Sequence, residues 1–336
     1  MTRLNLGLNR GLAAIYLLFS SPPLFPVAVA AERPLAAGAS VAPTSTPLQG
    51  SRPCWPAYPR AGASVAPTST PLQAAVRPFL WKVEGPRPSW LFGTMHSADP
   101  AVAHLPASVT TALDTRRSFH PEVEWSVELA PTLARKLFAT DTPELSTRLA
   151  PALWRRVQPA GAQLGLPDLF LDRLTPGLAA LLFLAPTDTD VAATVDGPLY
   201  ARATARRLAT APLETLDEQL GLWAQLPEAI AITALTEALA DVESGRPNEK
   251  KRLRAYASGN ERLVAAAIEA EFSASPGARA RAEPLLYRRN RVMTERLAPH
   301  LAQGGASVAI GAAHLLGPIS VIELLRARGV RITRVP

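Results

Sequence analysis

Segments with strand character occur only near the two ends of the stretch from residue 79 to residue 336, and this placement restricts the fold more than any other feature. The candidates are short β-rich or buried-type runs at 79–84, 89–95, 119–125, 306–310 and 330–335. Glycine and proline separate the first two runs, which is typical of two strands joined by a tight turn. We therefore expect one α/β domain (mixed α+β) with a sheet built from its N- and C-terminal parts.

The interval between these strands, from about residue 130 to residue 300, has the pattern of a large helical insertion. Apolar residues recur there at steps of three and four, which is the spacing of one helix face. A further helix is expected over 315–328, with Gly329 at its end. Proline and glycine predict breaks between helices at Pro151, 165–167, Pro186, Pro227, 245–247 and 275–277.

The N-terminus has the anatomy of a cleaved secretory signal peptide over residues 1–30. Two arginines lie in the first ten residues, an apolar stretch covers 11–19, and Ala28-Val29-Ala30 has the small-x-small form of a cleavage site. The competing interpretation is an uncleaved membrane anchor. Serines and prolines interrupt the apolar run well before the ~20 residues that a membrane span requires. We therefore expect cleavage, and no transmembrane span in the mature chain.

Residues 31–78 form a linker that we expect to be disordered. The segment is rich in Pro, Ala, Ser and Thr, and residues 37–49 recur identically at 61–73 as a tandem duplication. Such a composition cannot bury enough apolar surface to offset the entropy of ordering. A recognition role for the repeated Pro-Thr-Ser-Thr-Pro core stays open. The globular domain is then expected over residues 79–336.

Cysteine content and charge restrict the compartment and the partners. Cys54 is the single cysteine, so an intrachain disulfide is impossible, and no cysteine stands at the cleavage point for lipid attachment. The formal net charge of +7 comes mostly from arginines interspersed with glutamates. A nucleic-acid binder would show a dense basic stripe instead. We expect a periplasmic or secreted protein that binds no nucleic acid, and its oligomeric state stays open.

Two Gly-x-x-His sequences stand at the ends of expected strands and are the main candidates for a functional site. Gly93-Thr94-Met95-His96 ends the second β-rich run, and Gly311-Ala312-Ala313-His314 follows the strand at 306–310. Glycine lets the backbone turn tightly, and open α/β sheets bind ligands beyond the carboxyl ends of their strands. One such sequence is a weak signal, because a lone histidine is more often structural. Two in the same context favour a shared site for His96 and His314.

An acidic pair on the third extended run supplies further candidate ligands. Glu122 and Glu124 alternate with Val123 and Trp125, so both carboxylates are expected on one face of a strand. Solvation of that face explains the pattern without any function. Two histidines and a carboxylate are, however, a ligand set that divalent transition metals use in catalytic sites. Water bound to such a metal becomes a nucleophile at neutral pH.

Five sequence blocks, in order along residues 79–336, point to a known family. They are Phe79-Leu80-Trp81-Lys82-Val83, Trp90-Leu91-Phe92-Gly93-Thr94-Met95-His96, Leu213-Glu214-Thr215 with Gln219, Arg289-Asn290, and Gly311-Ala312-Ala313-His314-Leu315-Leu316-Gly317. Together they resemble the TraB/GumN family, whose animal relatives, the TIKI proteins, act as metal-dependent proteases on Wnt proteins. The resemblance implies hydrolysis of a peptide bond and a divalent ion, with manganese, cobalt and zinc as candidates.

The resemblance also implies roles for individual residues. The paired motifs of the family fall on His96 and His314, and its acidic position falls on Glu122, with Glu124 where a second acidic residue is usual. The arginine of the family falls on Arg289, as a clamp for an anion or a carboxylate. The residue before Glu122 is a proline, where the family has a smooth apolar strand. A shift in register there would leave Glu124 as the carboxylate that faces the site.

Two roles are open for the segment 213–219. Thr215 and Glu218 match a capping box, which explains both residues structurally. Glu214 and Gln219 would instead line the cleft, with Glu214 as a third catalytic candidate. The remaining histidines match no motif and are expected at the surface: His104, His120 and His300.

The sequence therefore leaves more than one class of function. The leading hypothesis is a metal-dependent hydrolase, a peptidase, in which Arg289 stabilises negative charge beside a His/His/Glu metal site. The rival is a non-catalytic periplasmic binding protein for a peptide or an envelope polysaccharide, in which the histidines only form hydrogen bonds. A structural envelope component is a third possibility.

Overall fold

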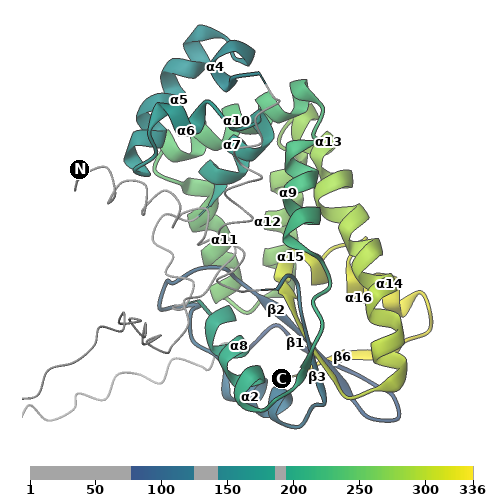
Figure 1. The fold of residues 1–336 in the computed structure, drawn as a ribbon. Coiled ribbons are helices and arrows are strands. Elements are labelled where there is room, and N and C mark those ends of the chain that lie inside the picture. The colour runs from purple at the N-terminus through teal and green to yellow at the C-terminus, as the bar shows by residue number, and fades with distance from the viewer. Residues whose placement is uncertain (1–76, 125–142, 186–193, 336) are drawn as a thin grey trace, which may run out of the picture. The chain divides into compact units, whose positions relative to one another are not determined.

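The computed structural model describes residues 77–124, 143–185 and 194–335 (Figure 1). The expected signal peptide, its cleavage site and the tandem duplication lie outside the described residues. Of the expected linker, only Arg77 and Pro78 are described, and the Arg77 side chain donates a hydrogen bond to the carbonyl of Val335 at 3.1 Å. Within the described ranges, no helix has the length and apolar character needed to cross a membrane.

A six-stranded mixed sheet joins the two ends of the described chain, which confirms the predicted architecture. The strand order is β4-β3-β5-β2-β1-β6. The first four strands in this order run parallel, whereas β1 is antiparallel to β2 and β6 is antiparallel to β1. The strands are β1 Leu80–Val83, β2 Ser89–Thr94, β3 Ser118–Pro121, β4 Ala209–Thr210, β5 Ala306–Gly311 and β6 Ile332–Arg334.

The register of the parallel strands brings three chain segments to one edge of the sheet. Thr94, at the end of β2, pairs with Gly311, at the end of β5. On the other side of β5, Pro121 of β3 pairs with Ala309. The carboxyl ends of β3, β5 and β2 therefore lie next to one another, and both Gly-x-x-His sequences begin at this edge.

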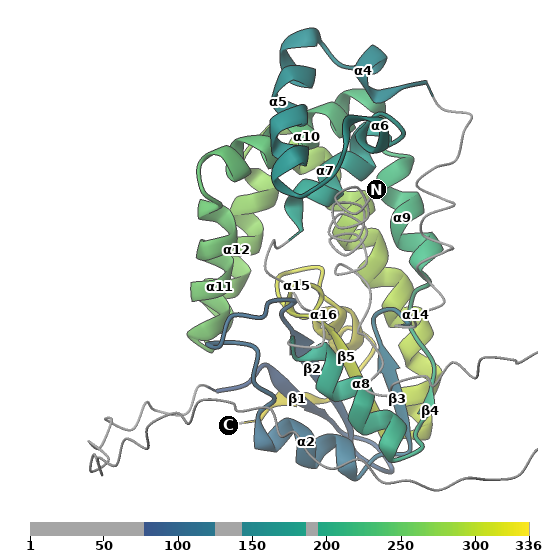
Figure 2. The same cartoon turned by 60° about the vertical axis from the view of Figure 1, so that its left-hand side comes forward.

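Helices pack against both faces of the sheet (Figures 1 and 2). Leu80 and Phe92 enter a core with residues of α2 and α8, whereas Trp81 and Leu91 enter a second core with residues of α12, α14 and α16. This alternation is the two-residue period of strand side chains. The helices are α2 Ala107–Asp114, α8 Asp196–Ala205, α12 Glu261–Ser273, α14 Arg288–Gln303 and α16 Val321–Arg326.

The helical insertion has an apolar core of its own. Its centre is α7 (Pro176–Leu184), in which nearly every residue is buried, and α7 packs on α10 (Glu228–Glu243). The other helices of the insertion are α4 Leu145–Arg148, α5 Pro151–Gln163, α6 Asp168–Leu171, α9 Leu216–Ala224, α11 Pro247–Ala257, α13 Pro276–Ala282 and the π-helical η2 Glu283–Tyr287.

Proline marks the helix starts that the sequence predicts. Pro151, Pro247 and Pro276 each lie in the first turn of a helix, and Pro227 directly precedes α10. A first-turn backbone N–H has no partner within the helix, so proline gives up no hydrogen bond there. The break predicted at Pro186 lies outside the described residues.

Two details of the predicted elements are wrong. The helix expected over 315–328 is split into α15 (Ala312–Leu315) and α16, because Gly317 has a φ of 99° and Pro318 follows it. The helical interval also contains β4, whose two exposed residues are too few to show a strand period.

His120 is buried, which corrects its expected place at the surface. It is 1% exposed, because β3 is an inner strand on which consecutive residues are covered from both faces. Its Nδ1 lies 3.0 Å from the carbonyl oxygen of Ala211, so Nδ1 carries the proton and Nε2 accepts from the Ser118 hydroxyl at 2.9 Å. Burial, aided by the nearby His300, lowers the pKa of His120 to about 4, and the ring is neutral at pH 7.

Candidate active site

Glu122 stands at the carboxyl end of β3, and the backbone fixes its direction. Its N–H donates to the carbonyl of Ala309 at 2.9 Å, and its own carbonyl accepts from the N–H of Glu214 at 2.8 Å. Val123 forms a parallel bridge with Glu214 and is 3% exposed. The strand pairing thus continues past the proline at 121, and Glu122 is the carboxylate that faces the site. Glu124 is exposed and is not brought to Glu122.

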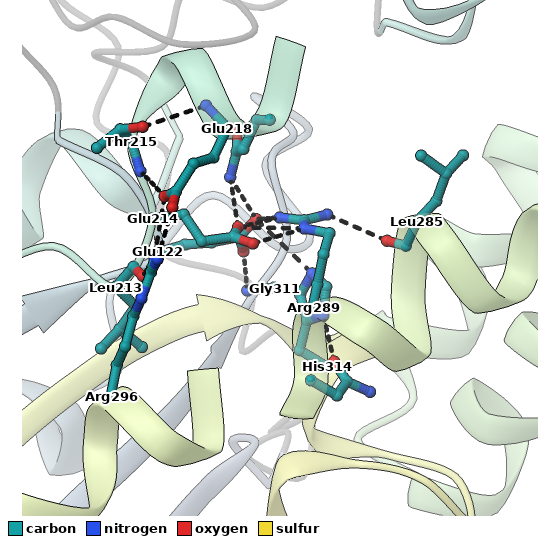
Figure 3. Close-up of polar contacts among 12 residues, drawn as sticks. Glu122, Leu213, Glu214, Thr215, Glu218, Leu285, Arg289, Arg296, Gly311 and His314 are labelled. Atoms are coloured by element: carbon teal, nitrogen blue, oxygen red, sulfur yellow. Dashed lines mark hydrogen bonds and ion pairs between the residues drawn. The ribbon is translucent and has the colours of Figure 1, made fainter. Parts of the chain in front are cut away.

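Arg289 joins the carboxylates of Glu122 and Glu214 into one buried cluster (Figure 3). Its Nη2 lies 2.6 Å from Glu122 Oε1 and 2.6 Å from Glu214 Oε2, and its Nε lies 3.0 Å from Glu214 Oε1. The amide nitrogen of Gln219 donates to the same two carboxylates, at 3.1 Å and 3.0 Å. Gln219 therefore lines the cavity of the site, whereas Glu214 is buried in the cluster and does not line it.

The second oxygen of Glu122 contacts the start of the C-terminal Gly-x-x-His. The N–H of Gly311 donates to Glu122 Oε2 at 2.8 Å. A Cβ atom on residue 311 would lie 3.2 Å from that oxygen, so glycine permits the close approach. Burial alone would raise the pKa of Glu122, but His314, Arg289, His96 and this N–H outweigh burial and hold the pKa well below its usual value. Glu122 is ionised at neutral pH.

His314 is held in one tautomer by Asn290. The Asn290 amide nitrogen donates to the carbonyl of Ile319 at 2.8 Å, which leaves its Oδ1 to accept from His314 Nδ1 at 2.6 Å. Nδ1 therefore carries the proton, and Nε2 has the free lone pair. This Nε2 lies 3.7 Å from Glu122 Oε1. Burial and then Arg289 lower the pKa of His314 to about 4, so the ring is neutral.

His96 is paired with an acid that the sequence did not reveal. Its Nδ1 lies 2.8 Å from Asp196 Oδ2, and the Thr194 hydroxyl donates to the same oxygen at 3.3 Å. Burial opposes the charged imidazolium, but Asp196, followed by Glu122, raises the pKa of His96 to about 9. Since 44% of the His96 side chain is exposed, solvent screens both effects, and the upward direction remains.

Two residues of the site were missed by the sequence analysis. Asp196 lies a hundred positions from His96, and nothing in its surroundings marks it except a place at the start of a helix. Asn290 belongs to a block that carries the resemblance, but no role was given to it. The capping box of Thr215 and Glu218 is confirmed, and Glu218 also pairs with Arg296 (Figure 3).

A cavity of about 220 Å³ opens onto these groups. One part of its lining is polar and includes His96, Asp196, Glu122, Gln219 and Arg289. The rest is apolar and comes mostly from β3, α7, α8 and α9. A small number of polar groups in a largely apolar pocket is typical of ligand sites.

Imidazole nitrogens and carboxylate oxygens, the ligand atoms around Glu122, are of the kinds that divalent metal ions bind. The described residues do not, however, provide a complete set of ligands. In both histidines Nδ1 is engaged by an oxygen atom, an arrangement that orients metal-binding imidazoles. His314 is neutral as a ligand must be, whereas His96 would first lose its proton. Among the described side chains, no group of three or more His, Cys, Asp or Glu lies close enough together to hold a metal ion.

The fold and the site together define a class of mixed α/β proteins, with paired Gly-x-x-His motifs at adjacent parallel strand ends and an arginine-carboxylate cluster beside them. The chain belongs to the TraB/PrgY/gumN family, whose sequence model matches residues 79–334. This match confirms the resemblance found from the motifs. Neither a curated protein nor a solved structure matches the chain.

Proposed function

We propose that this chain is an exported, metal-dependent hydrolase that cleaves peptide bonds at the site around Glu122. The observation that carries the proposal is the pair of His314 Nε2 and Glu122 Oε1, which lie 3.7 Å apart. Both atoms are proton acceptors, so no hydrogen bond joins them, and a cation between them would be stabilised by both. Two ligands of one tetrahedral ion with bonds of ~2.1 Å lie about 3.4 Å apart.

The residues we assign to the ion are His314, Glu122 and His96, with manganese, cobalt and zinc as candidates. Such an ion would act as a Lewis acid and would lower the pKa of a water molecule bound to it toward neutrality. Asn290 and Asp196 orient the two imidazoles through Nδ1. Glu124 as a further ligand stays a prediction.

Arg289 is the group that we assign to the negative charge developing on the attacked carbonyl oxygen. Its Nε–H and both Nη2 hydrogens point to Glu214 and Glu122, and one Nη1 hydrogen points to the carbonyl of Leu285 at 3.4 Å. Among the contacts of the described residues, the second Nη1–H is the donor that remains for a substrate oxygen. Glu214 acts through Arg289, because it fixes the plane of the guanidinium by accepting hydrogen bonds from both Nε and Nη2.

The proposal is tested by metal content and peptide cleavage of the full chain. We expect stoichiometric metal and cleavage products in mass spectra, and we expect His96→Ala and His314→Ala to abolish cleavage and to bind the metal more weakly. His104→Ala serves as the control, because His104 is exposed and lies outside the site. Metal uptake that is unchanged in both variants would contradict the metal site. Ligand binding that persists in chelator without any cleavage product would support the rival function, a binding protein.

A further inference from the structure

A second and larger cavity meets the first one at the site. It has a volume of about 740 Å³ and is lined by residues of α10, α11, α12, α13 and α14. His314 and Ala313 lie in its wall, so it reaches the C-terminal Gly-x-x-His. Both cavities share Trp223, Leu285 and Arg289 as lining residues. Arg289 therefore lines both cavities, with His96 lining the smaller one and His314 the larger.

We propose that the ligand of this site is an internal segment of an extended polypeptide that occupies both cavities at once. This inference rests on the proposed function and specifies its substrate class. A substrate with a free terminus at the cleaved bond would leave one of the two cavities empty. A chain that continues in both directions fills both, and its carbonyl groups pass Arg289.

Because the two cavities differ in size, each suits a different part of such a segment. Ligand pockets commonly measure about 300–1,000 Å³. The larger cavity, at about 740 Å³, falls within this range and can take several residues. The smaller cavity, at about 220 Å³, falls below the range and suits a single side chain. Its wall beside Arg289 is formed by Leu181, Leu222 and Trp223, so an apolar side chain fits best.

The charges in the larger cavity favour a main chain over a strongly charged ligand. Apart from Arg289, which Glu122 and Glu214 neutralise, three acidic residues face three basic ones. They are Glu237, Asp241 and Glu271 against Lys251, Arg252 and Arg281. Two of the basic side chains already form ion pairs within this set, Arg281 with Glu237 and Arg252 with Glu271. An acidic polysaccharide or a phosphate would meet no excess of positive charge.

The test compares peptide length in variants that obstruct only the larger cavity. Ala270 on α12 lines this cavity and is exposed, so Ala270→Trp narrows the cavity without disturbing the core. Ala266 lies one turn earlier on the same helix, is exposed and does not line the cavity, so Ala266→Trp is the matched control. Ser244→Trp obstructs the cavity from the end of α10, in case the new side chain on α12 turns to solvent.

The probes are an octapeptide blocked at both ends, with an apolar residue at its centre, and the blocked dipeptide from that centre. We expect Ala270→Trp or Ser244→Trp to weaken binding of the octapeptide, measured by fluorescence anisotropy, by about tenfold or more. Binding of the dipeptide, and of both probes to the Ala266→Trp variant, is expected to stay as in the unmodified chain. Circular dichroism confirms that each variant is folded.

The outcomes separate this inference from the proposed function. Cleavage of the dipeptide as fast as the octapeptide, with no effect of either cavity variant on the octapeptide, overturns the inference and leaves the hydrolase intact. Octapeptide binding that depends on length and on Ala270, with no cleavage of any peptide, supports the inference and overturns the hydrolase.

Discussion

Arg289 keeps a full positive charge inside the protein because two carboxylates surround it. Burial opposes this charge, but Glu122 and Glu214 outweigh burial and raise the pKa of Arg289 above its usual value. The side chains of Arg289 and Glu214 are only 15% and 4% exposed. A buried pair of this kind adds little stability by itself, yet removing the Glu214 carboxylate deprives Arg289 and Gln219 of a charged hydrogen-bond acceptor.

Replacing Glu214 should therefore destabilise the fold more than replacing a surface carboxylate. We expect Glu214→Gln to lower the free energy of unfolding by about 2 kcal/mol, measured by urea denaturation. Glu218→Gln is the control, because Glu218 pairs with Arg296 at a site where its side chain is 42% exposed, and glutamine also fits a capping box. Its loss should stay below about 1 kcal/mol. Equal losses in the two variants would contradict a buried charge cluster.

A substitution of Asn290 tests whether the tautomer of His314 matters for metal binding. Asn290→Leu removes the acceptor of the Nδ1 proton, and we expect metal affinity to fall by about 10–100-fold. Thr294→Val is the matched control, because Thr294 is also buried on α14 but bonds to the carbonyl of Asn290 within the helix. Affinities measured by calorimetry that are equal in the two variants would show that Asn290 does not orient the imidazole.

At the scale of elements, the start of α9 is fixed to α14 by a titratable pair. The hydrogen bond from Arg296, helped by the backbone N–H of Thr215, lowers the pKa of Glu218 to about 2. A carboxylate with a lowered folded pKa contributes stability above its unfolded value, and this contribution disappears as the pH falls toward the folded value. The contribution of Glu218 is thus present above about pH 4.5 and is lost toward pH 2.

The difference in stability between the unmodified chain and Glu218→Gln should follow this window. We expect the difference in unfolding free energy to be largest above about pH 5 and to shrink steadily toward pH 2. Urea titrations at several pH values measure it. A difference that stays constant with pH would mean that Glu218 carries no linked proton.

Sequence patterns predict helices and strands well where the periodic segment is long and where proline or glycine marks its ends. The apolar steps and prolines of the insertion predicted several of its helix boundaries but not the starts of α7 and α12, and the Gly-x-x-His motifs predicted the edge of the sheet at which both histidine segments begin. The break at Gly317 carries the same glycine-proline signal, but the prediction ran the helix through it because the apolar residues continue on both sides. The pattern could not show Asp196 beside His96, since a pairing across a hundred positions depends on how α8 packs on the sheet.

At the scale of the whole molecule, the site lies where the sheet meets the helical insertion. Glu122, His96 and His314 come from the strand ends, whereas Gln219 and Arg289 come from helices. Motif and strand context predicted Glu122, His96 and His314. Arg289 was named from the family resemblance, and lining the cleft was one of two open roles for the segment that contains Gln219. The convergence of these residues follows from the parallel register of β3, β5 and β2.

The proposed export of the chain has its own test. If residues 1–30 are a signal peptide, the mature protein recovered from the periplasm or the medium starts at Ala31. Intact-mass measurement of the secreted product should show the loss of these residues. A product that retains Met1 and stays with the membrane fraction would indicate an uncleaved anchor.

We propose that imidazoles from the two ends of the domain share one ion with Glu122. X-ray absorption at the metal edge of the loaded full chain measures the number of imidazole ligands directly. We expect two imidazoles at about 2.1 Å in the unmodified chain and one in each of His96→Ala and His314→Ala. A spectrum without imidazole scattering, or one that is the same in all three proteins, would contradict the claim.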